Sequence, residues 1–289
     1  MTKILKAYAK INLALFITAK RADGYHDLET VFAPINWFDE LHFSPSETLS
    51  MTCSDAGLPA DDSNLCMKAA GLLRAESGTK RGIKIHLQKN VPSGAGLGGG
   101  SSDAATVLRH LNEAWQLHLP PEALLKLASA LGADVAYFLS DAPLVYATGK
   151  GEVLEPLEFS LPYAVVTLFP HASVSTVWAY KNFKLKPNRT LPDLKAAMQQ
   201  VCLNRNAAAF SLFENDFEAV VFEHYPQVKA AKAKLLDAGA VFASLSGSGS
   251  AVFGVFNDDR AALNCYDDLR RSYPASLTPA DFRRSPRKT

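Results

Sequence analysis

The chain has 289 residues, of which 48% are hydrophobic, so it can bury the core of one large domain or two ordinary ones. Its 30 basic and 29 acidic side chains leave a net charge of +1, which indicates neither a nucleic-acid partner nor an anionic membrane. No window approaches about 18 uncharged apolar residues, so we expect no membrane span and a cytoplasmic protein.

The four cysteines, Cys53, Cys66, Cys202 and Cys265, are widely spread and contain no Cys-x-x-Cys pair. The seven histidines show no His-x-x-x-His spacing. These patterns argue against a zinc site, a redox motif and a transition-metal centre. We expect free, buried thiols.

In chain order, residues 6–17 alternate between apolar and polar positions, which predicts a half-buried strand with Lys10 and Asn12 on one face. Residues 21–26 contain an Asp-Gly turn, and residues 29–35 resume β character. The later pattern predicts mixed α and β structure, with helices at 65–75, 102–117, 121–131, 191–202 and 226–238 and strands at 83–87, 143–147, 163–168, 241–245 and 251–256. Turn formers at 149–156 favour a division near residue 155 into two lobes that share an interface.

A glycine-rich segment precedes the second predicted helix. It consists of Pro92, Ser93, Gly94, Ala95, Gly96, Leu97, Gly98, Gly99, Gly100, Ser101 and Ser102. Its glycines permit left-handed backbone angles that bring several N–H groups toward one anion, and a helix start adds about half a positive charge. The segment therefore predicts a phosphate cradle, with N-capping side chains from Ser101, Ser102 and Asp103.

Two common glycine loops do not fit this segment. A Walker A loop ends in Gly-Lys-Ser/Thr, whereas Gly100 is followed by two serines. A Rossmann fingerprint needs an acidic residue about twenty positions later, where the chain has Leu119-Pro-Pro. A flexible linker is disfavoured because the segment leads into an apolar helix.

Three motifs together resemble those of the GHMP small-molecule kinases: Lys10-Ile-Asn12, the glycine segment, and Leu245-Ser-Gly-Ser-Gly-Ser250. Further stretches, Arg21-Ala-Asp-Gly-Tyr-His26, Leu131-Gly-Ala-Asp-Val135 and Glu214-Asn-Asp-Phe217, are similar to members that act on a cytidine-diphosphate-linked methylerythritol in the non-mevalonate isoprenoid pathway. The resemblance covers nearly the whole chain. It implies an α+β (mixed α/β) two-lobed fold, with a left-handed βαβ-type, ribosomal protein S5 domain 2-like nucleotide lobe at 1–155 and a ferredoxin-like substrate lobe at 156–289.

The same resemblance implies transfer of the ATP γ-phosphoryl group to the 2-hydroxyl of that small-molecule substrate, with Mg²⁺ accompanying ATP. Asp134 is then expected to accept or orient the hydroxyl proton, and Lys10 to keep that carboxylate ionised and stabilise the attacking oxygen. The resemblance leaves the protein ligands of Mg²⁺ and the oligomeric state open. Ala136 stands where the family commonly has proline, which removes no reactive group.

Asn12 is expected to hydrogen-bond the methylerythritol portion of the substrate or to orient Lys10. Tyr25 and His26 are expected to bind the cytosine ring. Tyr180 is the candidate for a second aromatic side chain that packs on cytosine, and Trp178 is the alternative. Thr176 is the candidate for a contact with the sugar alcohol. The nucleotide base is expected near Asn64 and Lys89, although a helix cap and a surface lysine are alternative interpretations. Asp216 is expected to be structural, and residues 246–250 to pack beside the phosphate cradle.

Two other functions would account for part of this pattern. A homoserine, mevalonate or galactose kinase would keep the phosphate cradle but has no need of Asp-Gly-Tyr-His beside Lys-Ile-Asn. A non-catalytic nucleotide-binding protein of the same fold would not need both Lys10 and Asp134. Neither alternative requires all the motifs present.

Overall fold

The computed structural model describes residues 2–186 and 189–284 and divides into two compact units. Unit 1 contains the residues up to Ala9 together with Phe38–Val91 and Gly98–Asp141. Unit 2 contains Lys10–Trp37, Pro92–Leu97 and the chain from Ala142 onward. This division differs from a single boundary near residue 155, because strands β1 (Lys3–Lys20) and β2 (His26–Ser44) each run from one unit into the other.

Unit 1 contains a βαβ element. Helix α1 (Leu65–Ser77) connects the parallel strands β3 (Leu49–Cys53) and β4 (Ile83–Gln88). The second half of β2 pairs with β4 in antiparallel fashion, from Glu40 opposite Gln88 to Ser44 opposite Lys84. Alternating burial along β4 places Ile83, Ile85 and Leu87 in the core, as its period-two sequence predicts.

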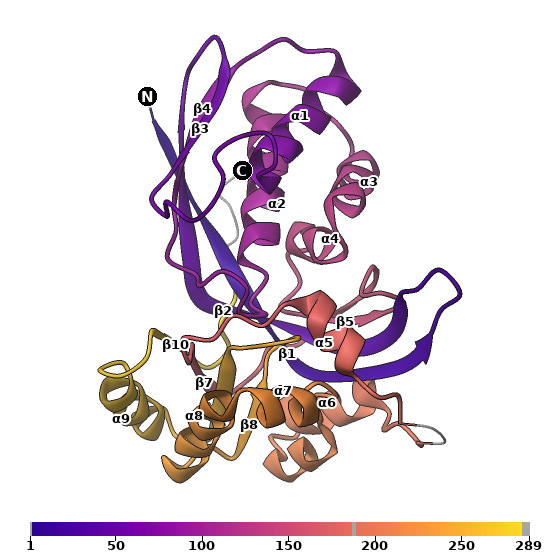
Figure 1. Ribbon diagram of the computed structural model, residues 1–289, viewed down its shortest axis with the longest axis vertical. Coiled ribbons are helices and arrows are strands. Elements are labelled where there is room, and N and C mark those ends of the chain that lie inside the picture. Colours follow the sequence, from indigo (N-terminus) through magenta and orange to yellow (C-terminus); the bar gives the residue numbers. More distant parts are fainter. Residues whose placement is uncertain (1, 187–188, 285–289) are drawn as a thin grey trace. The chain divides into compact units, whose positions relative to one another are not determined.

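Four helices of unit 1 pack on one another: α1, α2 (Gly99–Ala114), α3 (Pro121–Leu131) and α4 (Ala133–Leu139). In Figure 1, α1 and α2 lie beside β3 and β4, with α3 and α4 beyond them. Helix α1 begins after Asn64, whose side chain accepts a hydrogen bond from the Cys66 N–H, and ends at Gly78 in a left-handed conformation. These local signals explain why its predicted bounds were nearly right.

The start of α2 differs from the prediction. The helix begins at Gly99, with Gly98 at the N-cap in a left-handed conformation (φ +68°) and no capping side chain. Ser102 instead donates to the Tyr8 carbonyl at 2.7 Å, and Asp103 accepts from Lys89. The prediction of N-capping by Ser101, Ser102 and Asp103 is therefore wrong, because the glycines themselves form the first helical turn.

Unit 2 begins with a hairpin. The Arg21 N–H donates to the Tyr25 carbonyl at 2.8 Å, and Gly24 takes a φ of +86°, which forms the predicted Asp-Gly turn between β1 and β2. The first half of β2 pairs with β5 (Leu144–Thr148), which pairs in turn with β6 (Val153–Leu157).

The rest of unit 2 contains a four-stranded antiparallel sheet in the order β10-β7-β9-β8. Its strands are β7 (Ala164–Leu168), β8 (Phe242–Leu245), β9 (Val252–Phe256) and β10 (Ala275–Thr278). Helix α8 (Pro226–Asp237) packs on β8 and β9, and α9 (Asp259–Leu269) packs on β7 and β10. This βαββαβ arrangement confirms the expected ferredoxin-like element (Figure 1).

Between β7 and α8 the chain forms short helices: α5 (Thr176–Asn182), α6 (Leu194–Cys202), the 3₁₀ helix η1 (Ala207–Leu212) and α7 (Glu218–His224). Of these, only α6 was expected from the sequence, because helices of six or seven residues show too little periodicity. Cys66, Cys202 and Cys265 are buried free thiols, as expected, and Cys53 is a partly exposed one. No helix in the described ranges is long and apolar enough to cross a bilayer.

Candidate active site

Lys10 and Asn12 lie on one face of β1, as the alternation predicts, but the expected half-buried strand is wrong, because residues 9–17 are buried on both faces. The Lys10 ammonium donates to the Asn12 side-chain oxygen at 2.6 Å and to the Gly96 carbonyl at 3.1 Å. The Asn12 amide nitrogen donates to the Thr30 hydroxyl at 2.8 Å, and Thr30 donates to the Ala14 carbonyl at 2.6 Å. Both ends of the Asn12 amide are thus engaged, which fixes its orientation and holds Lys10 in place.

This cluster is nearly closed to solvent. Lys10 and Asn12 are each 3% exposed, and the Lys10 ammonium lies 5.2 Å from the centre of the Phe32 ring. A buried lysine of this kind must be hydrogen-bonded or paired, since desolvating an ammonium is costly. The hydrogen bond between them corresponds to one of the two roles expected of Asn12, orientation of Lys10, and contact of Asn12 with the methylerythritol portion stays a prediction.

Two glycine segments of unit 2 meet at this cluster. The Lys10 N–H donates to the Leu97 carbonyl at 3.0 Å, the Ser246 hydroxyl donates to the Gly96 carbonyl at 3.0 Å, and the Ala251 N–H donates to the Ala95 carbonyl at 3.0 Å. The Asn12 N–H also donates to the Ser246 hydroxyl at 3.3 Å. The prediction that residues 246–250 pack beside the phosphate cradle is confirmed for residues 92–97 of that cradle.

The glycine segment has the backbone conformation that its sequence suggests. Gly94, Gly96 and Gly98 have φ angles of +65°, +76° and +68°, whereas Gly99 and Gly100 belong to the first turn of α2. Alternating left-handed residues turn successive N–H groups toward a common side, and the first N–H groups of a helix have no carbonyl partner within the helix. An anion such as a phosphate is the expected ligand of such a backbone.

Asn64 and Lys89, the two residues expected near the nucleotide base, lie close to the start of α2 in unit 1. A methyl group on Gly100 would lie 3.8 Å from Leu65, the residue after Asn64, and one on Gly99 would lie 2.9 Å from the Lys89 ammonium. Asn64 caps α1, as its alternative interpretation holds. Lys89 is not a surface lysine, because its side chain is only 7% exposed and pairs with Asp39 and Asp103. Their contact with adenine stays a prediction.

Asp134 is partly buried in the first turn of α4, two residues after the N-cap residue Gly132. Helix α4 packs on α2 and α3 within unit 1. Ala136 is fully buried inside this helix, so the turn that carries Asp134 is ordered without the proline common in the family. Lys10 belongs to unit 2 and Asp134 to unit 1.

An aromatic cluster in unit 2 contains the residues expected to bind cytosine. The His26 and Tyr180 rings are stacked, with centroids 5.0 Å apart and planes 23° from parallel. Tyr180 also packs edge-on against Phe217, at 4.9 Å. Tyr25, next to His26, is 61% exposed, and the Lys150 ammonium lies 4.7 Å from its ring centre.

The electrostatics of His26 favour the neutral imidazole. Burial lowers the pKa of His26 below its ordinary value, and the nearby Lys20 charge lowers it further. A neutral imidazole has one donor and one acceptor, the combination required to recognise the polar edge of a pyrimidine.

Trp178 and Thr176 take different positions on α5. Trp178 packs against His224 and Tyr225, with centroid distances of 4.8 and 5.4 Å. Its ring therefore fills the space beside α7, whereas Tyr180 is the α5 aromatic that stacks on His26. The Thr176 hydroxyl lies 3.0 Å from the Ser248 hydroxyl and is thereby next to the second glycine segment.

Asp216 has the structural role expected for it. Its carboxylate binds the Arg189 guanidinium through two contacts of 2.7 Å and accepts from the Ile17 N–H at 2.7 Å. Burial alone would raise the pKa of Asp216, but these hydrogen bonds and Lys186 hold it below its usual range. Thr30 and Arg189 were not singled out from the sequence, because nothing local to them indicates their long-range partners.

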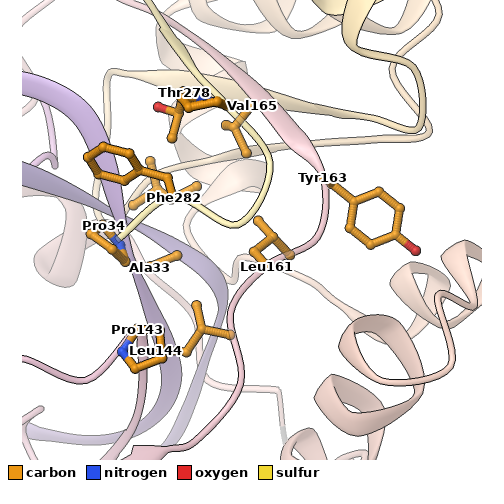
Figure 2. A pocket seen from close by; sticks show the side chains of 11 residues that line it. Ala33, Pro34, Pro143, Leu144, Leu161, Tyr163, Val165, Thr278 and Phe282 are labelled. Carbon is orange, nitrogen blue, oxygen red and sulfur yellow. The ribbon is translucent and has the colours of Figure 1, made fainter. Parts of the chain in front are cut away.

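A small apolar cavity in unit 2 is separate from these polar clusters. Its volume is about 10 Å³, roughly the room of one water, and its lining includes Ile11, Pro34, Leu144, Leu161 and Phe282. Figure 2 shows aliphatic and aromatic side chains around it and no charged group. Within residues 2–186 and 189–284, no three histidine, cysteine, aspartate or glutamate side chains gather as a metal-binding group.

Comparison with known proteins identifies the family. Residues 64–142 match the GHMP kinases N terminal domain, and residues 192–275 match the GHMP kinases C terminal domain. A 4-diphosphocytidyl-2-C-methyl-D-erythritol kinase of Chloroherpeton thalassium is 56% identical over 98% of this chain and 99% of its own length. The chain belongs to this kinase family. A second member, from Prosthecochloris aestuarii, is 55% identical over 96% of this chain and 97% of its own length.

Solved structures agree with the family assignment. The crystal structure of a 4-(cytidine 5'-diphospho)-2C-methyl-D-erythritol kinase matches 96% of this chain and 98% of its own, with a TM-score of 0.82 and 33% identity. A homoserine kinase from Cytophaga hutchinsonii has a TM-score of 0.68 at 19% identity, which shows a shared fold alone. The two-lobed GHMP kinase fold expected from the motifs is thereby confirmed, and the chain is an ATP-dependent kinase of this family.

Proposed function

We propose that this protein transfers the γ-phosphoryl group of ATP to the 2-hydroxyl of 4-diphosphocytidyl-2-C-methyl-D-erythritol, in the non-mevalonate route to isoprenoid precursors. The observation that carries the proposal is the 56% identity, over nearly the full length of both chains, to a kinase named for this substrate. The stacked His26–Tyr180 pair supports it, because an aromatic face beside a neutral imidazole suits a pyrimidine base.

In this proposal the phosphates of ATP bind backbone N–H groups of the glycine segment, within residues 93–102. The left-handed angles at Gly94, Gly96 and Gly98 and the uncapped start of α2 support that assignment. Mg²⁺ accompanies ATP and offsets charge on the phosphate oxygens.

Asp134 and Lys10 carry the chemical step. Asp134 accepts or orients the proton of the attacking hydroxyl, and Lys10 stabilises the oxygen that attacks the γ-phosphorus. The hydrogen bonds of Lys10 to Asn12 and Gly96 support its role, because they hold the ammonium in one position before substrate arrives. Phosphoryl transfer depends mainly on such positioning and on charge stabilisation.

Tyr25, His26 and Tyr180 bind the cytosine ring, and Thr176 binds the sugar alcohol. Tyr180 is preferred over Trp178 as the second aromatic side chain on cytosine because it stacks on His26, whereas Trp178 packs against His224 and Tyr225. The protein acts in the cytoplasm, where ATP is supplied.

A comparison of substrates tests the proposal. Purified protein with Mg-ATP is expected to phosphorylate the cytidine-linked alcohol, at a kcat/KM at least 100-fold above those for homoserine, mevalonate and galactose, since a site built for polar groups rejects substrates that lack them. Asp134→Ala is expected to nearly abolish turnover while it preserves nucleotide binding. Faster phosphorylation of any of the other three alcohols would refute the substrate assignment.

A further inference from the structure

Unit 1 contains a buried ion cluster at the start of α2 that the proposed reaction does not use directly. It joins Asp39 of β2, Lys89 just after β4, and Asp103 of α2, whose side chains are 0%, 7% and 2% exposed. The Lys89 ammonium binds Asp39 Oδ2 closely and donates to Asp103 Oδ2 at 3.3 Å. One cation therefore connects two carboxyl groups from separate elements.

The cluster also fixes the backbone that leads into the glycine segment. Asp39 Oδ1 accepts hydrogen bonds from the N–H groups of Asn90 and Val91, at 2.6 and 2.8 Å. Asp103 lies one helical turn after Gly99, so its contact with Lys89 holds the beginning of α2 against this same backbone. The two ends of the segment are thus anchored on one ion cluster.

The position of the ammonium is unusual for a purely stabilising ion pair. A methyl group on Gly99 would lie 2.9 Å from Lys89 Nζ, so the ammonium is next to the first residue of α2. A cation is unfavourable at a helix N-terminus, where the helix dipole is already positive. Buried ion pairs can often be replaced by apolar groups without loss of stability. A cation at this end does, however, favour an anionic ligand of the exposed N–H groups.

The charge of the cluster depends on Asp103. Burial, and then the Asp39 carboxylate, raise the pKa of Asp103 to about 8, against the opposing effect of Lys89. Asp103 Oδ1 is buried and accepts no hydrogen bond from any described residue. The other titratable groups near it are Cys66 of α1 and, beyond that thiol, Cys53 of β3. Although burial lowers it, the two carboxyl groups hold the pKa of Lys89 above its ordinary value.

Because its pKa is raised to about 8, Asp103 is largely protonated at neutral pH and adds little negative charge to the cluster. As the pH rises through about 8, Asp103 ionises and adds a negative charge beneath the first turn of α2. A negative charge there repels a phosphate bound to that turn.

We propose that Asp39, Lys89 and Asp103 are positioning residues, which hold the first turn of α2 in place for the phosphates of ATP, with Lys89 offsetting carboxylate charge beneath that turn. The inference rests on the proposed nucleotide site. It gives Lys89 an indirect role, through the α2 backbone, in addition to any contact with the base.

Titration of ADP binding by calorimetry between pH 7 and pH 9 tests the inference. In the unaltered protein, the Kd for ADP is expected to rise about 3- to 10-fold across this range. Asp103→Asn keeps an acceptor for Lys89 but cannot ionise, so its Kd is expected to stay within 2-fold. A purely structural role for Asp103 would not produce this difference in pH dependence.

Lys89→Met removes the cation and is expected to raise the Kd for ADP about tenfold at pH 7, with no change in the Kd for CDP, the probe for the cytidine pocket. The matched control is Arg81→Met, which removes a 2.6 Å hydrogen bond to the Trp115 carbonyl at the other end of α2 and should leave both affinities unchanged. If Lys89→Met does not fold, the Asp103→Asn titration decides the matter.

Equal pH dependence of ADP binding in Asp103→Asn and the unaltered protein would overturn the inference, as would unchanged ADP affinity in folded Lys89→Met. Failure of the proposed function would look different. The protein would then bind ADP with the expected pH dependence but would not phosphorylate the cytidine-linked alcohol.

Discussion

Gly96→Ala is expected to destabilise the protein more than an ordinary glycine substitution. Gly96 has a φ of +76°, and a methyl group on it would lie 2.0 Å from the Ser246 carbonyl oxygen and 3.1 Å from the Gly249 nitrogen. The left-handed backbone costs about 1–2 kcal/mol for a residue with a Cβ, and forcing two backbone segments apart adds about 1–3 kcal/mol. The expected loss is therefore about 2–5 kcal/mol.

Gly24→Ala is the matched control. Gly24 has a similar left-handed conformation, with φ +86°, but no atom lies within 4 Å of the position of its Cβ. Only the conformational part of the cost, about 1–2 kcal/mol, applies there. Chemical denaturation followed by circular dichroism gives both free energies of unfolding. Equal losses in the two variants would refute the steric part of the reasoning.

Gly96→Ala should also impair catalysis in the fraction that stays folded, because the Gly96 carbonyl accepts a hydrogen bond from Lys10. A shift of this carbonyl moves the ammonium, and misplacement by about 1 Å can reduce turnover about 100-fold. Steady-state kinetics with saturating ATP measure the effect. Gly24→Ala should retain kcat, since a methyl group on Gly24 would meet no atom within 4 Å.

Three further predictions concern binding and pH. Tyr180→Ala should weaken CDP binding about 5- to 100-fold in calorimetry, because base stacking is lost. Trp178→Ala should instead lower the free energy of unfolding with little change in CDP affinity. The reverse pattern would exchange the roles of the two residues. Asp216→Asn should lower the free energy of unfolding by about 1.5–3 kcal/mol at pH 7 through weakened bonds to Arg189. Because the pKa of Asp216 is depressed on folding, this deficit should shrink below about pH 4, and a pH-independent deficit would contradict the assignment. The pKa of Asp103 is raised on folding, so its contribution to stability is lost as the pH rises toward about 8. The free energy of unfolding should therefore fall more between pH 6 and pH 8 in the unaltered protein than in Asp103→Asn. Parallel curves of unfolding free energy against pH would exclude this titration.

The sequence predicts local structure well where the alternation of apolar and polar residues is long or where a residue marks the start or end of a helix. The alternation over residues 6–17 correctly places Lys10 and Asn12 on one face of β1, and Pro121 correctly begins α3. The spacing of glycines 94, 96 and 98 correctly indicates left-handed angles. Each of these features depends on neighbours within a few residues.

The remaining features depend on partners that are far apart in the chain. Thr30 orients Asn12 from another strand, and Asp39 meets Lys89 across 50 residues of sequence. The capping prediction for α2 failed because side-chain propensity favours Ser101–Asp103, whereas tertiary contacts with Tyr8 and Lys89 engage Ser102 and Asp103. No local pattern reports such contacts, so only the folded structure reveals them.

The substrate assignment is tested most directly by the initial rate of phosphoryl transfer from Mg-ATP to 4-diphosphocytidyl-2-C-methyl-D-erythritol, measured for the unaltered protein and for Asp134→Ala. We expect rapid formation of the 2-phosphate by the unaltered protein and a loss of at least 100-fold in kcat for the variant, with nucleotide binding preserved. No transfer to this alcohol by the unaltered protein, or an unaltered rate in the variant, would contradict the account.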